Sequence, residues 1–341
     1  MSTSRIPEGL TALMSRIPEW PAALTPRGPA WLAIRQHRFV LRIVLALTVT
    51  GALILIHHRI SIGKAAAAFA ATGCSTSYEP VKCDYYLREY PDSEEAFHAL
   101  LQTSAFWIMV LPIAIGAFVA GPLIAREMES GTYRLAWTQS VTPAHWLAAK
   151  LLAVAAAALG CVALLTTVQS WAWATGPRDY YGFPWWDSFT YASIGIVPLA
   201  YTALGIAAGA LVGLLVRRTV AAMSLTGLAV SAVLIVLGAA RSILWPLVTV
   251  TNNDVPEEAD GGWRIEEGLL TASGKRLPTD FCESSPDVGR CMADHGVSGR
   301  YLDYHPDPHF WPLQIVESGL VLALAAAASY GAFRVLRSHH G

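Results

Sequence analysis

Six stretches of about 20 apolar residues constrain this chain more than any other feature, because a run of that length spans the hydrocarbon core of a bilayer. The runs are Phe39–Ile56, Ala105–Ile124, Trp146–Val168, Ala192–Val216, Thr219–Ala239 and Glu317–Val335. A segment inside a bilayer must satisfy its own backbone polar groups, and no run alternates in the manner of barrel strands. The sequence therefore predicts an all-α polytopic membrane protein with six transmembrane helices.

The composition agrees with a membrane location. Hydrophobic residues make up 54% of the 341 residues and charged residues only 14%, with a mean hydropathy of +0.41. Soluble domains carry about 25% charged residues. About 38 polar and mixed residues precede the first run without a cleavage-like site, so we expect no signal peptide to be removed.

The distribution of charge predicts the orientation of the helices. If the N-terminus is cytoplasmic, the inside segments carry thirteen basic and four acidic residues, and the three outer loops carry ten basic and twenty acidic residues. Cytoplasmic segments are enriched in Lys and Arg. We therefore expect a multi-pass protein of the cell membrane with both termini in the cytoplasm.

Four regions follow from this reading. Residues 1–38 form an arm, 39–240 hold helices one to five with a charged loop at 125–145, 241–312 form an extracytoplasmic loop, and 313–341 hold helix six and a cytoplasmic tail. The arm mixes Leu, Trp and Arg between prolines, which favours short amphipathic helices on the inner membrane surface. An unstructured tail is the alternative. The aromatic loop Gln169–Tyr191 is either an interfacial belt or a substrate-stacking mouth.

The cysteines also separate the two sides of the membrane. Four of the five fall in the outer loops, as Cys74, Cys83, Cys282 and Cys291. Cys161 lies inside the third span. We predict two local disulfides in a disulfide-containing outer region, because paired cysteines are typical of an oxidising compartment. Free thiols are one alternative, and a zinc site shared with His305 and His309 is another, although no C-x2-C spacing exists.

Two further features concern contacts between the helices. Gly205, Gly209 and Gly213 recur every four residues on one face of the fourth span, so another helix is expected to pack closely there. That helix belongs either to this chain or to a second copy. Arg241 and Glu317 are lone charges at the outer ends of spans five and six. We expect them to form an ion pair, because an unpaired charge at that depth is costly.

The sequence excludes several kinds of chemistry. It has no G-x-x-x-x-G-K-[ST] phosphate loop and no H-E-x-x-H, G-x-S-x-G or G-x-G-x-x-G motif. No acidic residue lies in the middle of a span, where a proton relay would need one. We therefore expect no catalytic residues, no metal site and no cofactor in this chain, and no nucleic-acid partner. Energy for any transport must come from another protein.

The stretch "AREMESGTYRLAWTQS", which starts at Ala125, interrupts the apolar sequence with alternating charge. Thr142 and Pro143 then match an N-cap and first helical position, which predicts the start of the third span. The stretch is either a solvated turn or a surface on which a soluble partner pushes.

The passage "REMESGTYRLAWTQSVTPAHWLAAKLL" resembles the corresponding loop of type-2 ABC exporter permeases. That pattern has an acidic pair, then Gly-Thr, a short helix, and a lysine at the start of the next span, here Lys150. "WLAIRQHR" at Trp31 and "YHPDPHFWPLQIVESGL" at Tyr304 resemble the entry motif and the approach to the last span in actinobacterial members. The two cysteine pairs are not part of this pattern.

The resemblance implies a membrane subunit that pairs with a separately encoded ABC ATPase, which binds ATP and Mg, and with a second permease copy in a lipid membrane. It also implies that the charged loop transmits ATPase movement through Arg126, Glu127, Glu129, Gly131, Thr132 and Arg134. Family substrates include drugs, antibiotics, lipids and polysaccharides, so multidrug or antibiotic efflux is one expected role. A ligand-sensing or resistance complex, in which the outer loops bind a ligand, is the alternative function.

Overall fold

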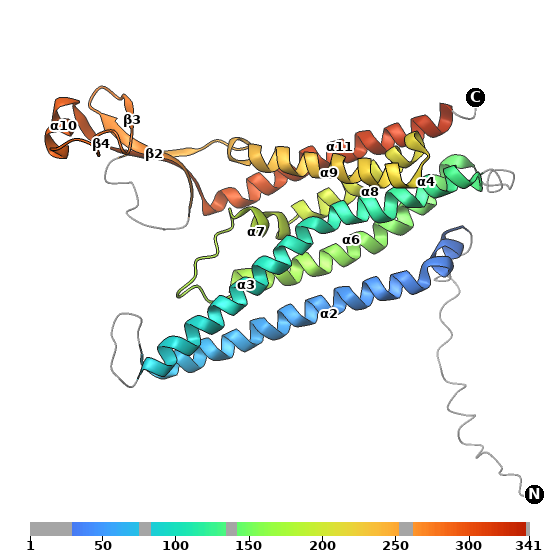
Figure 1. Ribbon diagram of the computed structural model, residues 1–341, viewed down its shortest axis with the longest axis horizontal. Helices are drawn as coiled ribbons and strands as arrows, with labels where there is room; N and C mark the ends of the chain where they lie inside the picture. Colours follow the sequence, from blue (N-terminus) through green and yellow to red (C-terminus); the bar gives the residue numbers. More distant parts are fainter. Residues whose placement is uncertain (1–28, 75–82, 134–141, 252–261, 339–341) are drawn as a thin grey trace, which may run out of the picture.

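The computed structural model describes residues 29–74, 83–133, 142–251 and 262–338. Most of the predicted arm and Arg134 of the charged loop lie outside these ranges. Within them, six helices are long and apolar enough to cross a membrane. Figure 1 shows how these helices are arranged. These are Arg42–Ala71, Arg88–Ser130, Pro143–Thr175, Val197–Val216, Thr219–Ile243 and Asp307–Ser338. The predicted six-helix membrane region is confirmed.

The first two spans form a helical hairpin that is longer than the predicted runs. Helix α2 covers Pro29–Ala71 and helix α3 covers Asp84–Ala114. The 43 residues of α2 extend about 64 Å at about 1.5 Å per residue, roughly twice the thickness of a bilayer core. The sequence analysis ended the first apolar run at Ile56 and began the second at Ala105, and most of the residues between them are helical rather than a loop.

The hairpin stays helical beyond the apolar runs because its two helices bury an apolar stripe between them. Leu55 and Ile62 of α2 pack with Tyr90, Phe97 and Leu101 of α3, all nearly inaccessible to solvent. These residues recur at helical spacing on each partner. The alanine-rich end of α2 adds strong intrinsic helix propensity.

The remaining helices pack around a central one. Helix α3 continues through the π-helix η3 (Ile115–Ala120) into α4 (Gly121–Ser130). The other helices are α6 (Pro143–Thr175), α7 (Ser188–Ser193), α8 (Val197–Val216), α9 (Thr219–Ala240) and α11 (Phe310–Ser338). Helix α8 contacts α3, η3, α4, α6, α9 and α11, and it is the most buried of the six spans.

The glycines of α8 explain this close packing. A Cβ atom on Gly205 would lie 2.4 Å from the carbonyl oxygen of Pro112, and one on Gly209 would lie 2.7 Å from the backbone nitrogen of Gly121. A Cβ on Gly213 would lie 3.0 Å from the Gly121 oxygen. The helix that covers this stripe therefore belongs to the same chain, namely the continuous α3–η3–α4 unit.

The start of α8 is capped from α11. The side-chain oxygen Oε1 of Gln314 accepts hydrogen bonds from the backbone N–H groups of Ile196 and Val197, at 3.0 and 3.1 Å. Its Nε2 donates to the backbone oxygen of Tyr191 at 3.2 Å. Gly195 has a φ of 72°, and a Cβ there would lie 2.5 Å from Oε1 of Gln314. A fully buried glutamine thus satisfies the first donors of the central helix.

The region between α9 and α11 folds into an antiparallel sheet that the sequence analysis did not predict. Its strands are β1 (Val248–Thr251), β2 (Gly262–Thr271), β3 (Arg276–Pro278) and β4 (Val297–Pro306), in the order β1-β4-β2-β3. The short helix α10 (Val288–Asp294) precedes β4. Figure 1 shows the sheet projecting from the bundle at the end opposite the C-terminus.

Polar contacts fasten the strands of the sheet to one another. Asp303 on β4 is buried, and it accepts hydrogen bonds from Thr249 on β1 and from the guanidinium of Arg276 on β3. That guanidinium also lies 4.4 Å from the centre of the Tyr301 ring. Burial opposes ionisation of Asp303, but the two hydrogen bonds outweigh it, so the pKa of this carboxyl lies below its usual value.

Both predicted disulfides are confirmed. Cys74 bonds to Cys83 and closes the tip of the α2–α3 hairpin, and Cys282 bonds to Cys291 beside the sheet. Among the described residues Cys161 is the free cysteine, and it lies half-buried in α6. The two cysteines of each bridge are nine positions apart in the sequence. Each bridge therefore stabilises a local turn rather than the bundle.

We predict that Asp303→Asn loosens the sheet near neutral pH, because the neutral amide loses the charge-assisted bond to Arg276. The folded pKa of Asp303 lies below the value of about 3.9 for an unfolded Asp. The stabilisation is therefore present above about pH 4 and is lost as pH falls through the folded pKa. Amide hydrogen exchange of residues 297–306 measures this.

The exchange difference between the Asp303→Asn variant and the parent should shrink in acid. Asp294→Asn, at an exposed position on α10, is the matched control and should leave the exchange unchanged. A difference that persists undiminished well below pH 4 would show that the ionised carboxylate is not what holds the strands.

Candidate functional site at the end of helix α4

The charged stretch forms the end of α4 and the start of the connection to α6. Helix α4 ends at Ser130, and Gly131 follows with a φ of 72°, the left-handed conformation that commonly ends a helix. Helix α6 begins at Pro143, where the Thr142 hydroxyl accepts from the backbone N–H of His145 at 3.3 Å. The predicted helix start at Thr142 and Pro143 is confirmed. Arg126 and Thr132 are exposed at this end.

Glu127 lies against the next helix rather than in solvent. Its carboxylate forms an ion pair with Lys150 on α6. The two side chains are 33% and 15% exposed, so the pair is partly withdrawn from water. The Lys150 ammonium also lies 4.7 Å from the centre of the Trp146 ring, a cation–π distance. Glu127 therefore joins α4 to α6.

Glu129 caps a different helix. Its Oε2 accepts from the backbone N–H of Thr219 at 2.9 Å and from the Thr219 hydroxyl at 2.6 Å. Thr219 is the first residue of α9, where backbone donors have no partner inside the helix and negative charge is favoured. Arg217, with a φ of 55°, makes the tight turn that brings α9 into position. Glu129 therefore joins α4 to α9.

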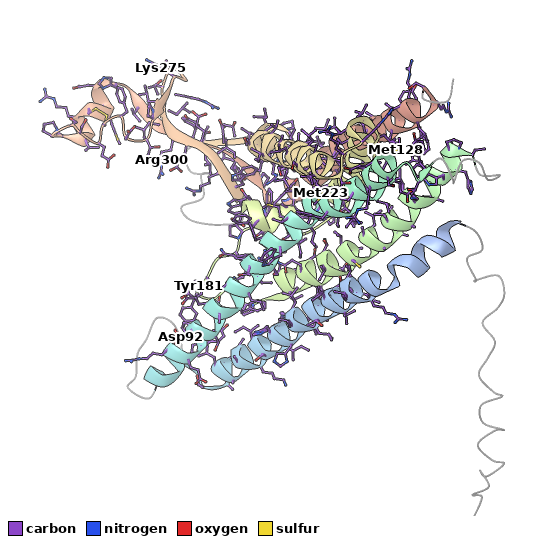
Figure 2. All side chains as sticks on the ribbon, turned by 45° about the vertical axis from the view of Figure 1, so that its right-hand side comes forward. Asp92, Met128, Tyr181, Met223, Lys275 and Arg300 are labelled. Atoms are coloured by element: carbon purple, nitrogen blue, oxygen red, sulfur yellow. A yellow bond between two sulfur atoms is a disulfide. The ribbon has the colours of Figure 1, made fainter. Side chains whose placement is uncertain are left out.

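An apolar cluster lies beneath these two contacts. Four helices contribute to it: Ile124 and Met128 come from α4, Trp146 and Leu147 from α6, Ala210 and Leu214 from α8, and Ala332 and Leu336 from α11. Figure 2 labels Met128 at this end of the bundle. Because these side chains interlock, a displacement of α4 must displace its neighbours.

At the opposite end of the bundle, a buried ion pair joins α9 to α11. Nε of Arg241 lies 3.0 Å from Oε2 of Glu317, and both side chains are almost inaccessible to solvent. The Tyr201 hydroxyl donates to Oε1 of Glu317 at 3.0 Å. The guanidinium carbon lies 3.8 Å from the centre of the Tyr191 ring. The structure thus brings together the two charges that the sequence analysis paired.

A comparison of the sequence with protein-family models identifies the family. The family described as ABC-2 membrane transporter related matches residues 45–241, more than half of the chain. The chain belongs to this family. It is therefore a multi-pass membrane subunit of the ABC transporter class, and this kind of subunit is not the catalytic one. Neither the search of curated proteins nor the search of solved structures gives a match.

The matched region of this ABC-2 protein contains the site described above. Residues 45–241 include the α4 end, both of its polar contacts and the glycine stripe of α8. The antiparallel sheet and α11 lie outside the matched region. The end of α4 therefore lies within the part of the chain that the family model matches, whereas the sheet lies beyond it.

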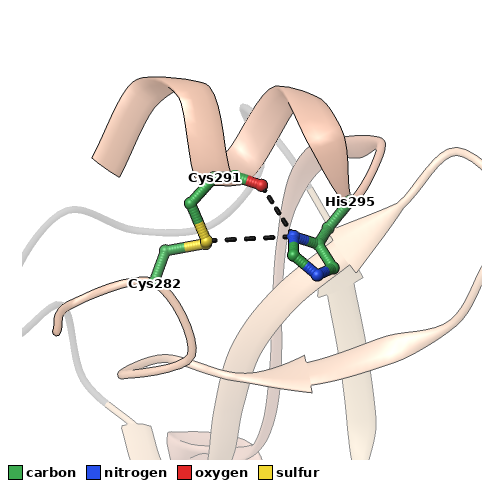
Figure 3. A group of neighbouring side chains, drawn as sticks. All are labelled: Cys282, Cys291 and His295. Carbon is green, nitrogen blue, oxygen red and sulfur yellow. Dashed lines mark hydrogen bonds between the residues drawn. A yellow bond between two sulfur atoms is a disulfide. The ribbon is translucent and has the colours of Figure 1, made fainter. Parts of the chain in front are cut away.

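One group near the sheet has the residue types of a metal site, as Figure 3 shows. Ligand atoms of Cys282, Cys291 and His295 lie within 4.8 Å of one another. Both sulfur atoms are joined in a disulfide, and Nδ1 of His295 lies 2.9 Å from the backbone oxygen of Cys291. A disulfide sulfur is not the thiolate that binds zinc. The group therefore stabilises α10 and is no metal centre while the bridge is intact.

Sequence reasoning missed three functional contacts. The capping of α9 by Glu129 and of α8 by Gln314 both join residues about 90 or more positions apart. Glu94 and His98 form a buried pair on α3, in the stretch between the first two predicted spans, where the sequence analysis expected no helix. Of these three contacts, only the Glu94–His98 pair had a signal in the sequence. The four-residue spacing between Phe97 and Leu101 indicates a buried helix face next to that pair.

We predict that Glu317→Gln strongly lowers thermal stability, because it leaves the Arg241 charge buried without a counter-charge. Removing one partner of a buried pair costs about 3–5 kcal/mol. The double variant with Arg241→Gln should recover part of the loss. Glu267→Gln is the control, since Glu267 pairs with Arg264 at an exposed position and should change stability by about 1 kcal/mol or less. Strictly additive losses in the double variant would contradict the coupling.

Proposed function

We propose that this chain is the membrane-spanning permease of an ATP-driven exporter, powered by a separate ABC ATPase. Family membership supports the transport role. The sequence has no phosphate loop, so hydrolysis must occur in a partner. The distribution of basic residues supports a cell-membrane protein with both termini in the cytoplasm, which places the end of α4 on the ATPase side.

The observation that carries this proposal is the pair of contacts at the end of α4. Glu127 holds α6 through Lys150, and Glu129 holds the start of α9 through Thr219. Helix α4 is also continuous with η3 and α3. A movement of this end therefore reaches four of the six spans. The span formed by α3, η3 and α4 moves directly, and α8 follows through the glycine contact. The carboxylates of Glu127 and Glu129 carry the movement to α6 and α9.

We infer two roles for the predicted coupling residues from the contacts that they make. Glu127 and Glu129 act inside the chain, because their carboxylates already bind α6 and α9. Arg126 and Thr132 are exposed beside them and supply the surface for an ATPase. Gly131 ends the helix between the two sets. The acids therefore transmit movement, and the exposed residues receive it.

The second candidate function is a ligand-sensing or resistance complex. The feature that favours it is the antiparallel sheet, which lies outside the matched family region and is connected to the rest of the chain by partly buried polar contacts in and next to its last strand. Trp185 donates to Asp307 at 2.8 Å, and His305 lies 3.0 Å from the Ser242 oxygen. Ligand-stimulated ATP hydrolysis without vesicle flux would favour sensing over export.

We predict that Glu127→Lys uncouples the complex, because two like charges then face each other at the α4–α6 contact. The swap Glu127→Lys with Lys150→Glu should restore coupling, since it rebuilds the ion pair. A partly exposed pair contributes about 1 kcal/mol. The measurements are co-purification of the ATPase and ATP hydrolysis by the complex in vesicles. If the swap stays uncoupled, Glu127 acts on the ATPase directly and not through α6.

Arg126→Glu tests the exposed surface separately. It should reduce co-purification of the ATPase while leaving thermal stability unchanged, because Arg126 is exposed. Glu89→Lys, at an exposed position near the other end of the same continuous helix, is the control and should leave ATPase binding intact. Failure of any ATPase to co-purify with the parent chain would contradict the proposed function itself.

A further inference from the structure

The two disulfides of this chain differ in one respect. Both join cysteines that are nine positions apart. Around the bridge at the tip of the α2–α3 hairpin, the sequence has no histidine from residue 59 to residue 97. Beside the Cys282–Cys291 bridge, however, the imidazole of His295 lies one helical turn beyond Cys291, at the end of α10 (Figure 3). Neither this histidine nor its bridge has a part in the proposed transport function.

Two contacts hold the His295 ring next to the bridge. Its Nδ1 donates to the backbone oxygen of Cys291 at 2.9 Å, since a carbonyl oxygen only accepts. Its ring also packs edge-on against Phe281, with the ring centres 4.9 Å apart. Nδ1 thereby lies 3.8 Å from Sγ of Cys291, and the ligand atoms of Cys282, Cys291 and His295 all lie within 4.8 Å of one another. The imidazole is therefore already in place beside the two sulfur atoms.

The spacing of these atoms suits a tetrahedral metal ion. Zinc binds a thiolate sulfur at about 2.3 Å and an imidazole nitrogen at about 2.0–2.1 Å, so a sulfur and a nitrogen on one tetrahedral zinc ion lie about 3.6 Å apart. The observed separation between Nδ1 of His295 and Sγ of Cys291 is 3.8 Å. Two thiolates and one imidazole also form zinc sites that keep the fourth position open. The residue types and their spacing therefore both match zinc.

The disulfide keeps this site closed, because zinc binds thiolates and not a disulfide. A dithiol reductant opens it by thiol–disulfide exchange. One thiolate of the dithiol attacks Sγ of Cys291, which is half-buried, and Cys282, which is only 1% exposed, leaves as a thiolate and takes up a proton. The second thiolate of the dithiol then attacks the mixed disulfide, releases Cys291 and forms the disulfide of the reductant. The Cα atoms of the two cysteines lie 5.8 Å apart, so rotation of the side chains is enough to place both sulfurs around an ion.

The charge of the surrounding segment favours a cation. Between residues 280 and 295, four acidic residues stand against one arginine, namely Asp280, Glu283, Asp287, Asp294 and Arg290. Asp287 caps α10 by accepting from the backbone N–H of Arg290 at 2.9 Å. The segment keeps a net negative charge, which raises the local concentration of cations.

The histidine of this site is not one of the two that the sequence suggested as zinc ligands. Nδ1 of His305 lies 3.1 Å from Nδ1 of His309, and Nε2 of His305 lies 3.0 Å from the backbone oxygen of Ser242. Both ring nitrogens of His305 are therefore engaged where the sheet meets the ends of α9 and α11. Only His295 stands beside the cysteines among the described residues.

We propose that Cys282, Cys291 and His295 form a zinc site when the bridge between the two cysteines is reduced. Each cysteine gives up its thiol proton when it binds the ion. His295 binds through Nδ1, so the proton of its neutral ring moves to Nε2, on a side chain that is exposed to solvent. The fourth position is left to water. Either the bridge or the ion then fastens α10 to the segment that precedes it, so the sheet responds to thiol reductants and to zinc together.

Titration of the full chain in lipid nanodiscs with Zn²⁺ tests this. The protein carries no polyhistidine tag, is treated with a phosphine reductant and is desalted without oxygen before Zn²⁺ is added. Reduction should create a zinc site in the parent chain, and Co²⁺ at the same site should show the absorption of tetrahedral thiolate ligation. Cys282→Ser with Cys291→Ser should abolish this site, whereas the matched control, Cys74→Ser with Cys83→Ser, should keep it. His295→Ala retains both bridges, and after reduction its zinc affinity should be at least about ten-fold lower.

The outcomes separate the proposal from its alternatives. Zinc binding that does not depend on reduction, or equal binding by the two double variants, would overturn it. An unchanged affinity in His295→Ala would show a site without the imidazole and would overturn it as well. Amide hydrogen exchange of residues 297–306 reports whether the sheet stays folded after reduction. If reduction unfolds the sheet and Zn²⁺ does not restore its protection, the proposal also fails. None of these measurements requires the ATPase, so failure here leaves the proposed transport function standing.

Discussion

The close approach of α8 to the α3–η3–α4 unit is the contact on which the bundle depends. A Cβ on Gly205, Gly209 or Gly213 would meet backbone atoms of that unit at 2.4 to 3.0 Å. Lipid tails are as apolar as the helix faces, so helices in a membrane associate mainly through close packing and hydrogen bonds. The π-helix η3 lies directly against this contact, in a geometry that is frequent at functional sites.

Polar contacts then fix the two ends of the bundle in different ways. At one end, partly exposed carboxylates of α4 reach Lys150 on α6 and Thr219 on α9. At the other end, the Arg241–Glu317 pair and the Gln314 cap are buried. Partly exposed contacts are weaker and break more readily than buried ones. The end that we assign to the ATPase is therefore the one suited to movement, and the opposite end is suited to holding the sheet in place.

Prediction from sequence succeeded where a signal is local. Thr142 and Pro143 mark a helix start because capping involves residues only three positions apart. The disulfides were predictable because each pair is nine residues apart in one loop. The hairpin between α2 and α3 was missed, because a search for long apolar runs stops at charged residues such as Glu94, although glutamate itself favours a helix.

The sequence by itself determined the six spans, the charged interruption after Ile124 and the two disulfide pairs, since hydrophobic run length, charge and residue type are properties of the chain. Only the tertiary structure decided what the charged residues contact. Glu129 meets Thr219 across 90 residues, and β1 pairs with β4 across more than 50. The packing of the whole fold determines such partners. The residues next to a carboxylate or a strand edge in the sequence do not indicate which distant group will hydrogen-bond to it.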